Sequence, residues 1–212
     1  MKKLLGALFV SFGLIASVAH ATPDAPELNK DYSVLAQPQP VDVPAGKIEV
    51  TEFFWYGCPH CFAFEPMIEQ WAKNKGADVV FDRVPVAFRP DFVPHSKMYH
   101  ALVALGKAQE LTIKIFNEIH VKKNYLLTPE AQAAFFAQNG IDSKTYLAAY
   151  NSFSMNADIQ RDTQMLTNYK IDGVPTVIIQ GKYVTSPEQT NSLEGTIKVI
   201  DWIDAQIRAK KL

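Results

Sequence analysis

Cysteine is almost absent from this 212-residue chain. Only Cys58 and Cys61 are present, and just two residues separate them. A chain of this length can bury a full hydrophobic core without covalent cross-links, so the shortage excludes a scaffold held together by disulfides. A structural zinc site needs four ligands, and two cysteines supply only half of them. The close pair therefore points to chemistry rather than to structural support.

An excess of charge of either sign is also absent. The net charge is −1 at pH 7, from 21 lysines and arginines against 22 aspartates and glutamates. The positive residues are scattered along the chain, so no nucleic-acid partner is predicted. Internal repeats and low-complexity segments are missing too, and we therefore expect an ordinary globular protein.

Long apolar runs are missing except at the start of the chain. Lys2 and Lys3 precede an apolar stretch at residues 4–18, and Ala19-His20-Ala21 matches a small-x-small cleavage site. This arrangement is typical of a secretory signal peptide. A membrane anchor is the alternative, but the run is short for a bilayer and no stop-transfer charges follow it. We expect a signal peptide over residues 1–21 and a soluble mature protein of 212 − 21 = 191 residues.

The mature sequence begins with a strand, a helix and a second strand. Its first residues are rich in proline and should be mostly irregular, with a short edge strand at 31–36. Residues 47–55 are rich in β-branched and aromatic side chains, which predicts a buried strand. A helix is expected over 58–73 and another strand over 77–88. This order favours a parallel βαβ unit.

The pattern then becomes helical for about eighty residues. Thr128 and Asp142 suit the starts of two of these helices. Strands return at residues 174–180 and 183–185, and a last helix is expected over 196–210. The predicted fold class is α/β, interrupted by an all-helical insertion. The expected parts are 22–88 for the first half of the α/β domain, 89–165 for the insertion and 166–212 for the second half.

The two cysteines lie where the first long strand meets the first helix. A helix N-terminus presents free amide hydrogens and a partial positive charge, so the pKa of Cys58 should be lowered there. Cys61 is three residues further on, on the same face of the helix, and the two sulfur atoms can reach each other. Cys58 should lie at the exposed end, with Cys61 behind it. We expect Cys58 to react with partners and Cys61 to be the resolving thiol.

The two residues between the cysteines strengthen this expectation. Pro59 suits the first turn of a helix, where no amide hydrogen is needed. His60 places a positive charge or a hydrogen-bond donor beside Cys58. Each pKa unit by which a thiolate is stabilised favours the reduced protein by about 1.4 kcal/mol. The protein should therefore tend to give its disulfide away.

A zinc site and an inert structural disulfide remain alternatives for the cysteine pair. A zinc site could recruit His95, His100 or His120, although the first two are five residues apart and do not share a helical face. A structural disulfide would stabilise little, because closing a loop of four residues removes little chain entropy. The spacing at a helix start favours a redox role over both.

Two motifs connect the sequence to a known family. CPHC at 58–61 and GVPT at 173–176 resemble the active-site motif and the proline loop of the DsbA family of periplasmic thiol:disulfide oxidoreductases. The resemblance covers nearly the whole mature chain. It implies a thioredoxin fold with an inserted helical domain, and a monomer without a cofactor or metal. It also implies a periplasmic location, unfolded exported substrates with free thiols, and a DsbB-like, quinone-linked membrane partner that restores the disulfide.

The same resemblance assigns roles to individual residues. Cys58 matches the nucleophile that becomes linked to the substrate, and Cys61 matches its buried partner. Pro175 looks like a cis-proline that faces the disulfide, although an ordinary strand-start proline is the alternative. The backbone of Val174 and Thr176 would then pair with an extended substrate strand.

Three charged residues are further candidates. Glu52 shares a strand face with apolar side chains, and a carboxylate there is costly unless it is paired or protonated. It resembles the family's buried acid, which accepts a proton from Cys61. Glu65 and Arg83 resemble the charged partners around that acid, although a solvated surface position is an equal alternative for both.

The predicted function is therefore the oxidation of thiols in newly exported proteins. A disulfide isomerase or reductase with the same centre is one alternative, and a chaperone-like binder of unfolded exported chains is another. Isomerases of this kind usually carry an added dimerisation module, and residues 22–46 offer little room for one before the first strong strand.

Overall fold

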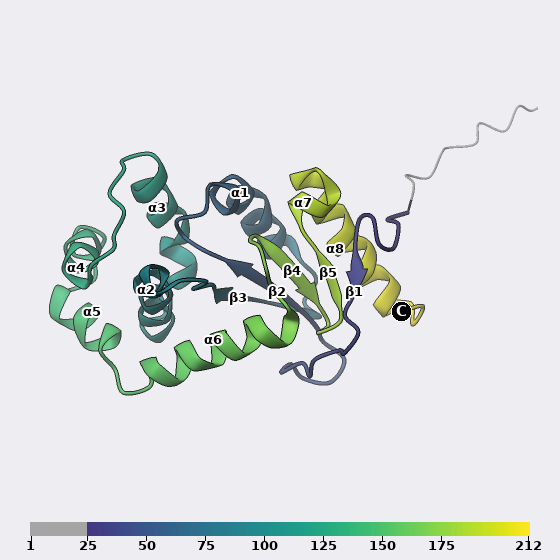
Figure 1. Cartoon of the computed structure of the whole chain (residues 1–212), viewed down its shortest axis with the longest axis horizontal. Helices are drawn as coiled ribbons and strands as arrows, with labels where there is room; N and C mark the ends of the chain where they lie inside the picture. The colour runs from purple at the N-terminus through teal and green to yellow at the C-terminus, as the bar shows by residue number, and fades with distance from the viewer. Residues whose placement is uncertain (1–24) are drawn as a thin grey trace, which may run out of the picture.

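A mixed five-stranded sheet forms the centre of the protein. The computed structural model describes residues 25–212 (Figure 1), so the predicted signal peptide lies outside the described residues. The strands are β1 (Ser33–Val34), β2 (Ile48–Phe54), β3 (Val79–Pro85), β4 (Thr176–Ile179) and β5 (Tyr183–Thr185). Their order is β1-β5-β4-β2-β3. Only β2 and β3 are parallel among these neighbours, which confirms the predicted βαβ unit and the short edge strand.

Helices make up most of the rest of the described chain. They are α1 (Pro59–Asn74), α2 (Val93–Ala104), α3 (Ala108–His120), α4 (Pro129–Ala137), α5 (Ser143–Tyr150), α6 (Met155–Tyr169), α7 (Pro187–Thr190) and α8 (Leu193–Arg208). A single 3-10 turn at Pro90–Phe92 leads into α2. The α/β class and the run of helices between β3 and β4 are as predicted.

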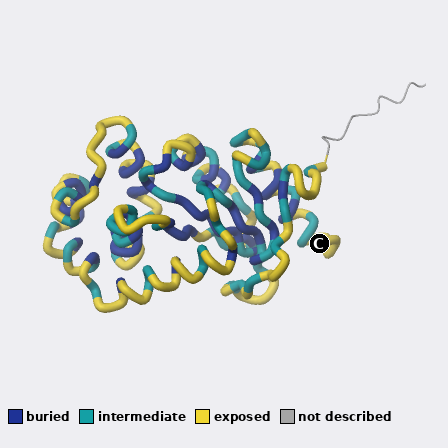
Figure 2. The backbone as a smooth tube through the Cα atoms, in the orientation of Figure 1, coloured by how far each residue is buried: buried dark blue, intermediate teal, exposed yellow. Residues whose placement is uncertain are grey.

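Helices cover both faces of the sheet. On one face, α1 and α8 pack over β2 and β4, and their shared core includes Val50, Ile68 and Ile200. On the other face, the C-terminal end of α6 places Tyr169 against Phe53. The buried segments in Figure 2 lie along the sheet and on the inner sides of these helices. The sheet is therefore shielded from water where β2 delivers the chain to Cys58.

The helices α2–α5 gather at one end of the sheet, together with the first part of α6 (Figure 1). Their core is continuous with the cysteine segment. Phe54, Cys58 and Cys61 belong to the same buried cluster as Phe116 of α3 and Phe136 of α4. The helical part therefore forms one wall of the surroundings of both thiols.

Local side-chain caps explain where several helices begin. Thr128 accepts a hydrogen bond from a backbone amide of α4, and Asp142 does the same for α5, as predicted. Ser192 caps α8, so this helix begins at Leu193, three residues before the predicted start. The predicted boundaries of the helical insertion stay a prediction, because the chain passes from one part to the other through continuous packing.

Candidate active site

Cys58 is the N-cap residue of α1. Its backbone is extended, with φ −82° and ψ 120°, and Pro59 begins the helix immediately after it. The Cys58 amide donates to the carbonyl oxygen of Trp55 at 2.9 Å, which closes the turn between β2 and α1. The predicted helix start and the place of Pro59 in the first turn are both observed.

The proline loop lies against Cys58. The Cys58 sulfur donates a hydrogen bond to the carbonyl oxygen of Val174 at 3.4 Å. The Val174–Pro175 peptide bond is cis, and Thr176 begins β4, where it pairs with Phe53 of β2. The two sequence motifs, more than a hundred residues apart in the chain, therefore meet at one sulfur atom.

Cys58 has a lowered pKa, shifted from 9.0 to about 6. The largest cause is a hydrogen bond from the Cys61 thiol, and the backbone amides of His60 and Cys61 donate as well. Burial opposes the shift, and the charge of His60 is the last of the contributions. The side chain of His60 is exposed, which limits its electrostatic effect. The helix end acts as predicted, whereas the dominant part of Cys61 was not expected.

Cys61 shows the opposite behaviour. Burial raises its pKa well above 9.0, and the hydrogen bond and charge of Cys58 raise it further. The charge of Glu52 acts in the same direction. The exposed fraction is 1% for Cys61 and 7% for Cys58. Cys58 is thus less exposed than the sequence suggested, because the loop carrying Val174 packs beside it.

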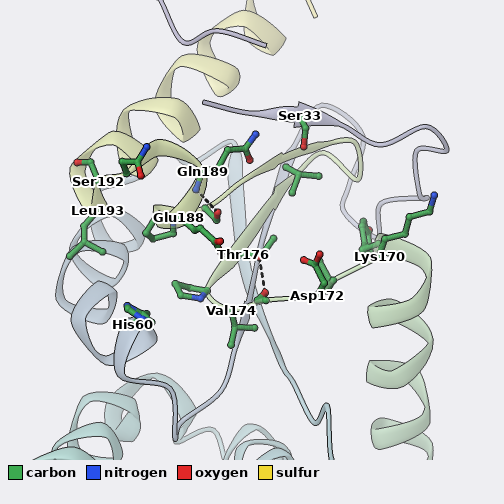
Figure 3. Close-up of a pocket in the computed structure, with 18 of the residues that line it drawn as sticks. Ser33, His60, Lys170, Asp172, Val174, Thr176, Glu188, Gln189, Ser192 and Leu193 are labelled. Atoms are coloured by element: carbon green, nitrogen blue, oxygen red, sulfur yellow. Dashed lines mark hydrogen bonds between the residues drawn. The ribbon is translucent and has the colours of Figure 1, made fainter. Parts of the chain in front are cut away.

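A groove of about 800 Å³ opens beside the proline loop (Figure 3). It lies between the start of α1, the loop before β4 and the segment around α7. His60, Val174 and Thr176 line it, and Figure 3 shows His60 of α1 and Val174 of the proline loop at the same end of the groove. The Thr176 hydroxyl donates to the carbonyl oxygen of Gly173 at 2.8 Å, which holds the loop in shape. The lining does not include either cysteine, but it includes Val174, whose carbonyl oxygen accepts the hydrogen bond from Cys58, so an extended peptide in the groove would lie beside the loop that contacts Cys58.

A buried charged cluster lies near Cys61. Arg83 Nε donates to Glu52 Oε2 at 2.8 Å, and Arg83 Nη2 donates to Glu65 Oε2 at 3.0 Å. The third partner is Glu69, with its Oε2 atom 3.6 Å from Arg83 Nη1. The side chains of Glu52, Glu65 and Arg83 are 1%, 2% and 6% exposed. The surface alternative for Glu65 and Arg83 is therefore wrong, because the fold pairs both with the buried Glu52.

Burial dominates the titration of these carboxyl groups. It raises the pKa of Glu65 to about 8, against the opposing charge of Arg83. The pKa of Glu52 is raised for the same reason, and Arg83 again acts in the opposite direction. One guanidinium thus faces three carboxyl groups, and burial favours keeping a proton on Glu52 or Glu65.

Sequence reasoning missed Glu69. It lies four residues after Glu65 on α1, so the two side chains share one face of the helix. That spacing was the available signal, but it is equally common on a solvated helix. Only the partner on β3, Arg83, distinguishes the two cases.

The three histidines considered as zinc ligands have other partners. His95 Nε2 lies 2.8 Å from the carbonyl oxygen of Tyr125. His100 Nε2 lies 2.6 Å from Asp162 Oδ2, and His120 Nε2 lies 2.8 Å from the carbonyl oxygen of Tyr56. Within residues 25–212, no group of three or more potential ligand side chains is arranged to hold a metal ion. Over the same residues, no helix is long and apolar enough to cross a membrane.

Comparisons with known proteins identify the family of the chain. The family model of the DSBA-like thioredoxin domain matches residues 49–198. The thiol:disulfide interchange protein DsbA of Burkholderia cepacia is 55% identical over 212 residues, the full length of both chains. The protein of the same name from Pseudomonas aeruginosa is 36% identical over 206 residues, covering 97% of this chain and 96% of that one.

Solved structures of DsbA proteins are similar in fold to this chain. The crystal structure of Pseudomonas aeruginosa DsbA aligns with a TM-score of 0.83 at 37% identity, covering 87% of this chain and 96% of that one. Reduced DsbA1 from Neisseria meningitidis aligns with a TM-score of 0.78 at 29% identity, covering 89% and 98%. The thioredoxin-like fold with added helices is confirmed. This chain belongs to the DsbA family of thiol:disulfide oxidoreductases.

Proposed function

We propose that this protein oxidises exported proteins by donating the disulfide of Cys58 and Cys61 to their thiols. The observation that carries the proposal is the unequal placement of the two thiols: Cys58 caps the start of α1 and contacts the proline loop, where its pKa is lowered, whereas Cys61 is buried behind it, where its pKa is raised. A thiolate at Cys58 is a stable leaving group, and its stability favours the reduced form of the enzyme. A protein with this imbalance gains free energy when its disulfide passes to a substrate.

The reaction has two exchange steps. A substrate thiolate attacks the Cys58 sulfur, the bond to Cys61 breaks, and the electron pair goes to the Cys61 sulfur. Because its pKa is raised, Cys61 takes up one proton. The second substrate thiolate then attacks the substrate sulfur of the mixed disulfide. Cys58 leaves as a thiolate, which needs no proton at neutral pH, and the substrate departs with a disulfide.

Glu52 supplies the proton to Cys61 in this scheme. Its side chain is 1% exposed, and its charge is close enough to affect the pKa of Cys61. Burial also raises the pKa of Glu52 itself, so this carboxyl group can hold a proton at a higher pH than an ordinary glutamate.

Substrates bind in the groove beside the proline loop. An extended segment next to the substrate cysteine pairs through its main chain with Val174 and Thr176, which explains tolerance of many sequences. Pro175 lacks an amide hydrogen and leaves the neighbouring backbone groups to the substrate. His60 borders the same groove.

The remaining partners follow from the family. The protein acts as a monomer in the periplasm, and a DsbB-like, quinone-linked membrane protein restores its disulfide. Support comes from the full-length similarity to interchange proteins named DsbA and from the N-terminal sequence pattern of a signal peptide.

The reduction potential tests the oxidant role. Equilibration with glutathione buffers should give a potential more oxidising than about −200 mV. The purified protein should also oxidise a peptide with two thiols stoichiometrically. A potential well below that value would instead indicate a reductase. Efficient reshuffling of wrongly paired disulfides, with little net oxidation, would indicate an isomerase, and prevention of aggregation by a variant lacking both cysteines would indicate a chaperone.

A further inference from the structure

The catalytic cycle has two halves, donation of the disulfide and its restoration, and each half moves one proton between Cys61 and water. When the disulfide is donated, Cys61 takes up a proton, and when the disulfide is restored, it must lose that proton before it attacks the mixed disulfide. Neither Cys61 nor Glu52 contacts water to a useful extent, since each is 1% exposed. A transfer from Cys61 to Glu52 therefore leaves the proton inside the protein, and a further group has to connect it with solvent.

Three carboxyl groups meet at one guanidinium below Cys61. The distances from Arg83 are 2.8 Å to Glu52, 3.0 Å to Glu65 and 3.6 Å to Glu69. The carboxyl groups therefore lie close to one another, with a single positive charge between them. A proton released at Glu52 has two neighbouring acceptors, held by the same side chain.

Glu69 alone among the three reaches toward water. Its side chain is 14% exposed, against 1% for Glu52 and 2% for Glu65. Its two oxygen atoms face different surroundings. Glu69 Oε2 is buried, contacts Arg83, and has no hydrogen-bond partner among the described residues. Glu69 Oε1 lies 3.2 Å from the ammonium group of Lys73, which is 60% exposed.

A cavity of about 350 Å³ adjoins this carboxyl group. Glu69, Arg83, Tyr99 and Gln109 contribute to its lining. It gives water a place to approach the outer side of the cluster, while Glu52 stays enclosed. The titratable or charged groups that face the cluster are Glu52 of β2, Tyr56 after it, Glu65, Glu69 and Lys73 of α1, Lys75 after it, Asp82 and Arg83 of β3, and Tyr99 of α2.

We propose that Glu69 is the solvent-facing end of the proton path that serves Cys61, with Glu52 at its inner end and Arg83 holding the two together. This inference rests on the proposed role of Glu52 and extends it to a residue that positions and exchanges the proton without touching the substrate. During reoxidation the proton passes from Cys61 to Glu52, crosses the cluster, and leaves at Glu69 to water. During substrate oxidation it moves in the opposite direction.

Reoxidation by oxidised glutathione proceeds in two exchanges, and only the second requires Cys61 to lose its proton. In the first exchange, the Cys58 thiolate attacks glutathione disulfide and releases one glutathione thiolate, with no proton lost from Cys61. In the second, Cys61 loses its proton, attacks the Cys58 sulfur and releases the other glutathione thiolate. Stopped-flow fluorescence with quenched samples measures both rates. The first exchange therefore serves as an internal control.

The test variant is Glu69→Gln, which keeps the shape of the side chain and removes the carboxyl group that can take up and release a proton. Its second exchange should slow by about tenfold, less than the roughly hundredfold effect expected for an acid–base group acting directly. The first exchange should keep its rate. Acetate ions, small enough for the cavity, should restore the second exchange in this variant, and Glu69→Asp should retain most of the rate. A purely structural role of Glu69 predicts no rescue by acetate.

Glu118→Gln is the matched control. Glu118 also pairs with a lysine four residues later, Lys122, and is 12% exposed, but it lies on α3 and is not part of the cluster. Its loss should leave both exchanges unchanged. An unaltered second exchange in Glu69→Gln, or a slowing that acetate does not relieve, overturns the proposal. If Glu52→Gln slows the second exchange and Glu69→Gln does not, the role of Glu52 stands and only the path through Glu69 fails.

Discussion

The surroundings of Cys58 and Cys61 differ although only two residues separate them. Cys58 receives hydrogen bonds from a helix start and from the Cys61 thiol, and its pKa falls to about 6. Cys61 lies among buried side chains above an acidic cluster, and its pKa rises. One shared hydrogen bond acts on both, lowering the pKa of the acceptor and raising that of the donor. The asymmetry therefore belongs to the pair and not to either residue alone.

The largest expected disturbance comes from removing the cation below Cys61. Arg83→Met leaves three carboxyl groups without their shared positive charge, and such a loss in a buried ion pair costs about 3–5 kcal/mol. The folded-state pKa values of Glu52 and Glu65 are already raised and would rise further. A carboxyl group whose pKa is higher in the folded protein than in the unfolded one contributes its full stability at a pH below the unfolded pKa. This contribution is lost as the pH rises through the folded pKa. Denaturant midpoints should therefore show a smaller cost at pH 5 than at pH 8.

Arg208→Met is the control for this prediction. Arg208 pairs with Asp78 at 2.6 Å, but both side chains are about two-fifths exposed. An exposed pair of this kind contributes little to stability, because solvent screens its charges. Equal destabilisation by the two substitutions would contradict the importance given to the buried cluster.

The second prediction compares the stability of the reduced and the oxidised form, because formation of the disulfide removes both thiols at once. A group with a lowered folded-state pKa contributes stability above its unfolded pKa, and this contribution is lost as the pH falls through the folded value. For Cys58 these values are 9.0 and about 6. After a discount for partial screening by solvent, the stability of the reduced form relative to the oxidised form should increase by about 3 kcal/mol between about pH 6 and about pH 9. Denaturant melts of both forms measure it, and a constant difference would count against the lowered pKa.

Replacing the inner cysteine isolates the shared hydrogen bond. Cys61→Ala removes the largest cause of the low pKa of Cys58, and a hydrogen bond to a charged group is worth about 1.5–3 kcal/mol. The pKa of Cys58 should rise by about one to two units. Thiolate absorbance as a function of pH measures it. Cys61→Ser keeps a donor at the same place, so its effect should be smaller, and identical pKa values in the two variants would exclude the hydrogen bond as the cause.

The smallest effect is expected at His60. Its side chain is exposed, and its charge is the last of the contributions to the low pKa of Cys58. His60→Ala should raise that pKa by about half a unit or less, since exposed charge pairs are weak. The same absorbance titration applies, at low and high salt. A rise larger than that of Cys61→Ala would reverse the order of causes described above.

Local features of the fold and of the site were predictable from the sequence, because they depend on neighbouring residues. The helix start at Cys58, the place of Pro59 and the caps at Thr128 and Asp142 follow from rules that span a few residues. The burial of Glu52 followed from strand alternation alone.

Features that depend on distant segments were not predictable in the same way. Glu65 and Arg83 come from a helix and a strand, and only their approach to Glu52 shows that they are not surface charges. Glu69 was missed for the same reason. The proline loop meets Cys58 because β4 pairs with β2, and sequence alone placed it there only through family resemblance.

The buried cluster that joins Phe54, Cys58 and Cys61 to α3 and α4 has an evolutionary consequence. A helical segment between two strands resembles a module that a lineage could lose or exchange without harm to the rest. Here the removal of α2–α6 would expose the side of Cys61 that burial now protects, and the pKa difference between the cysteines would shrink. The chemistry of the thiols therefore depends on the helices, and we expect that a graft of CPHC onto a smaller thioredoxin-like protein would not carry the same redox behaviour with it.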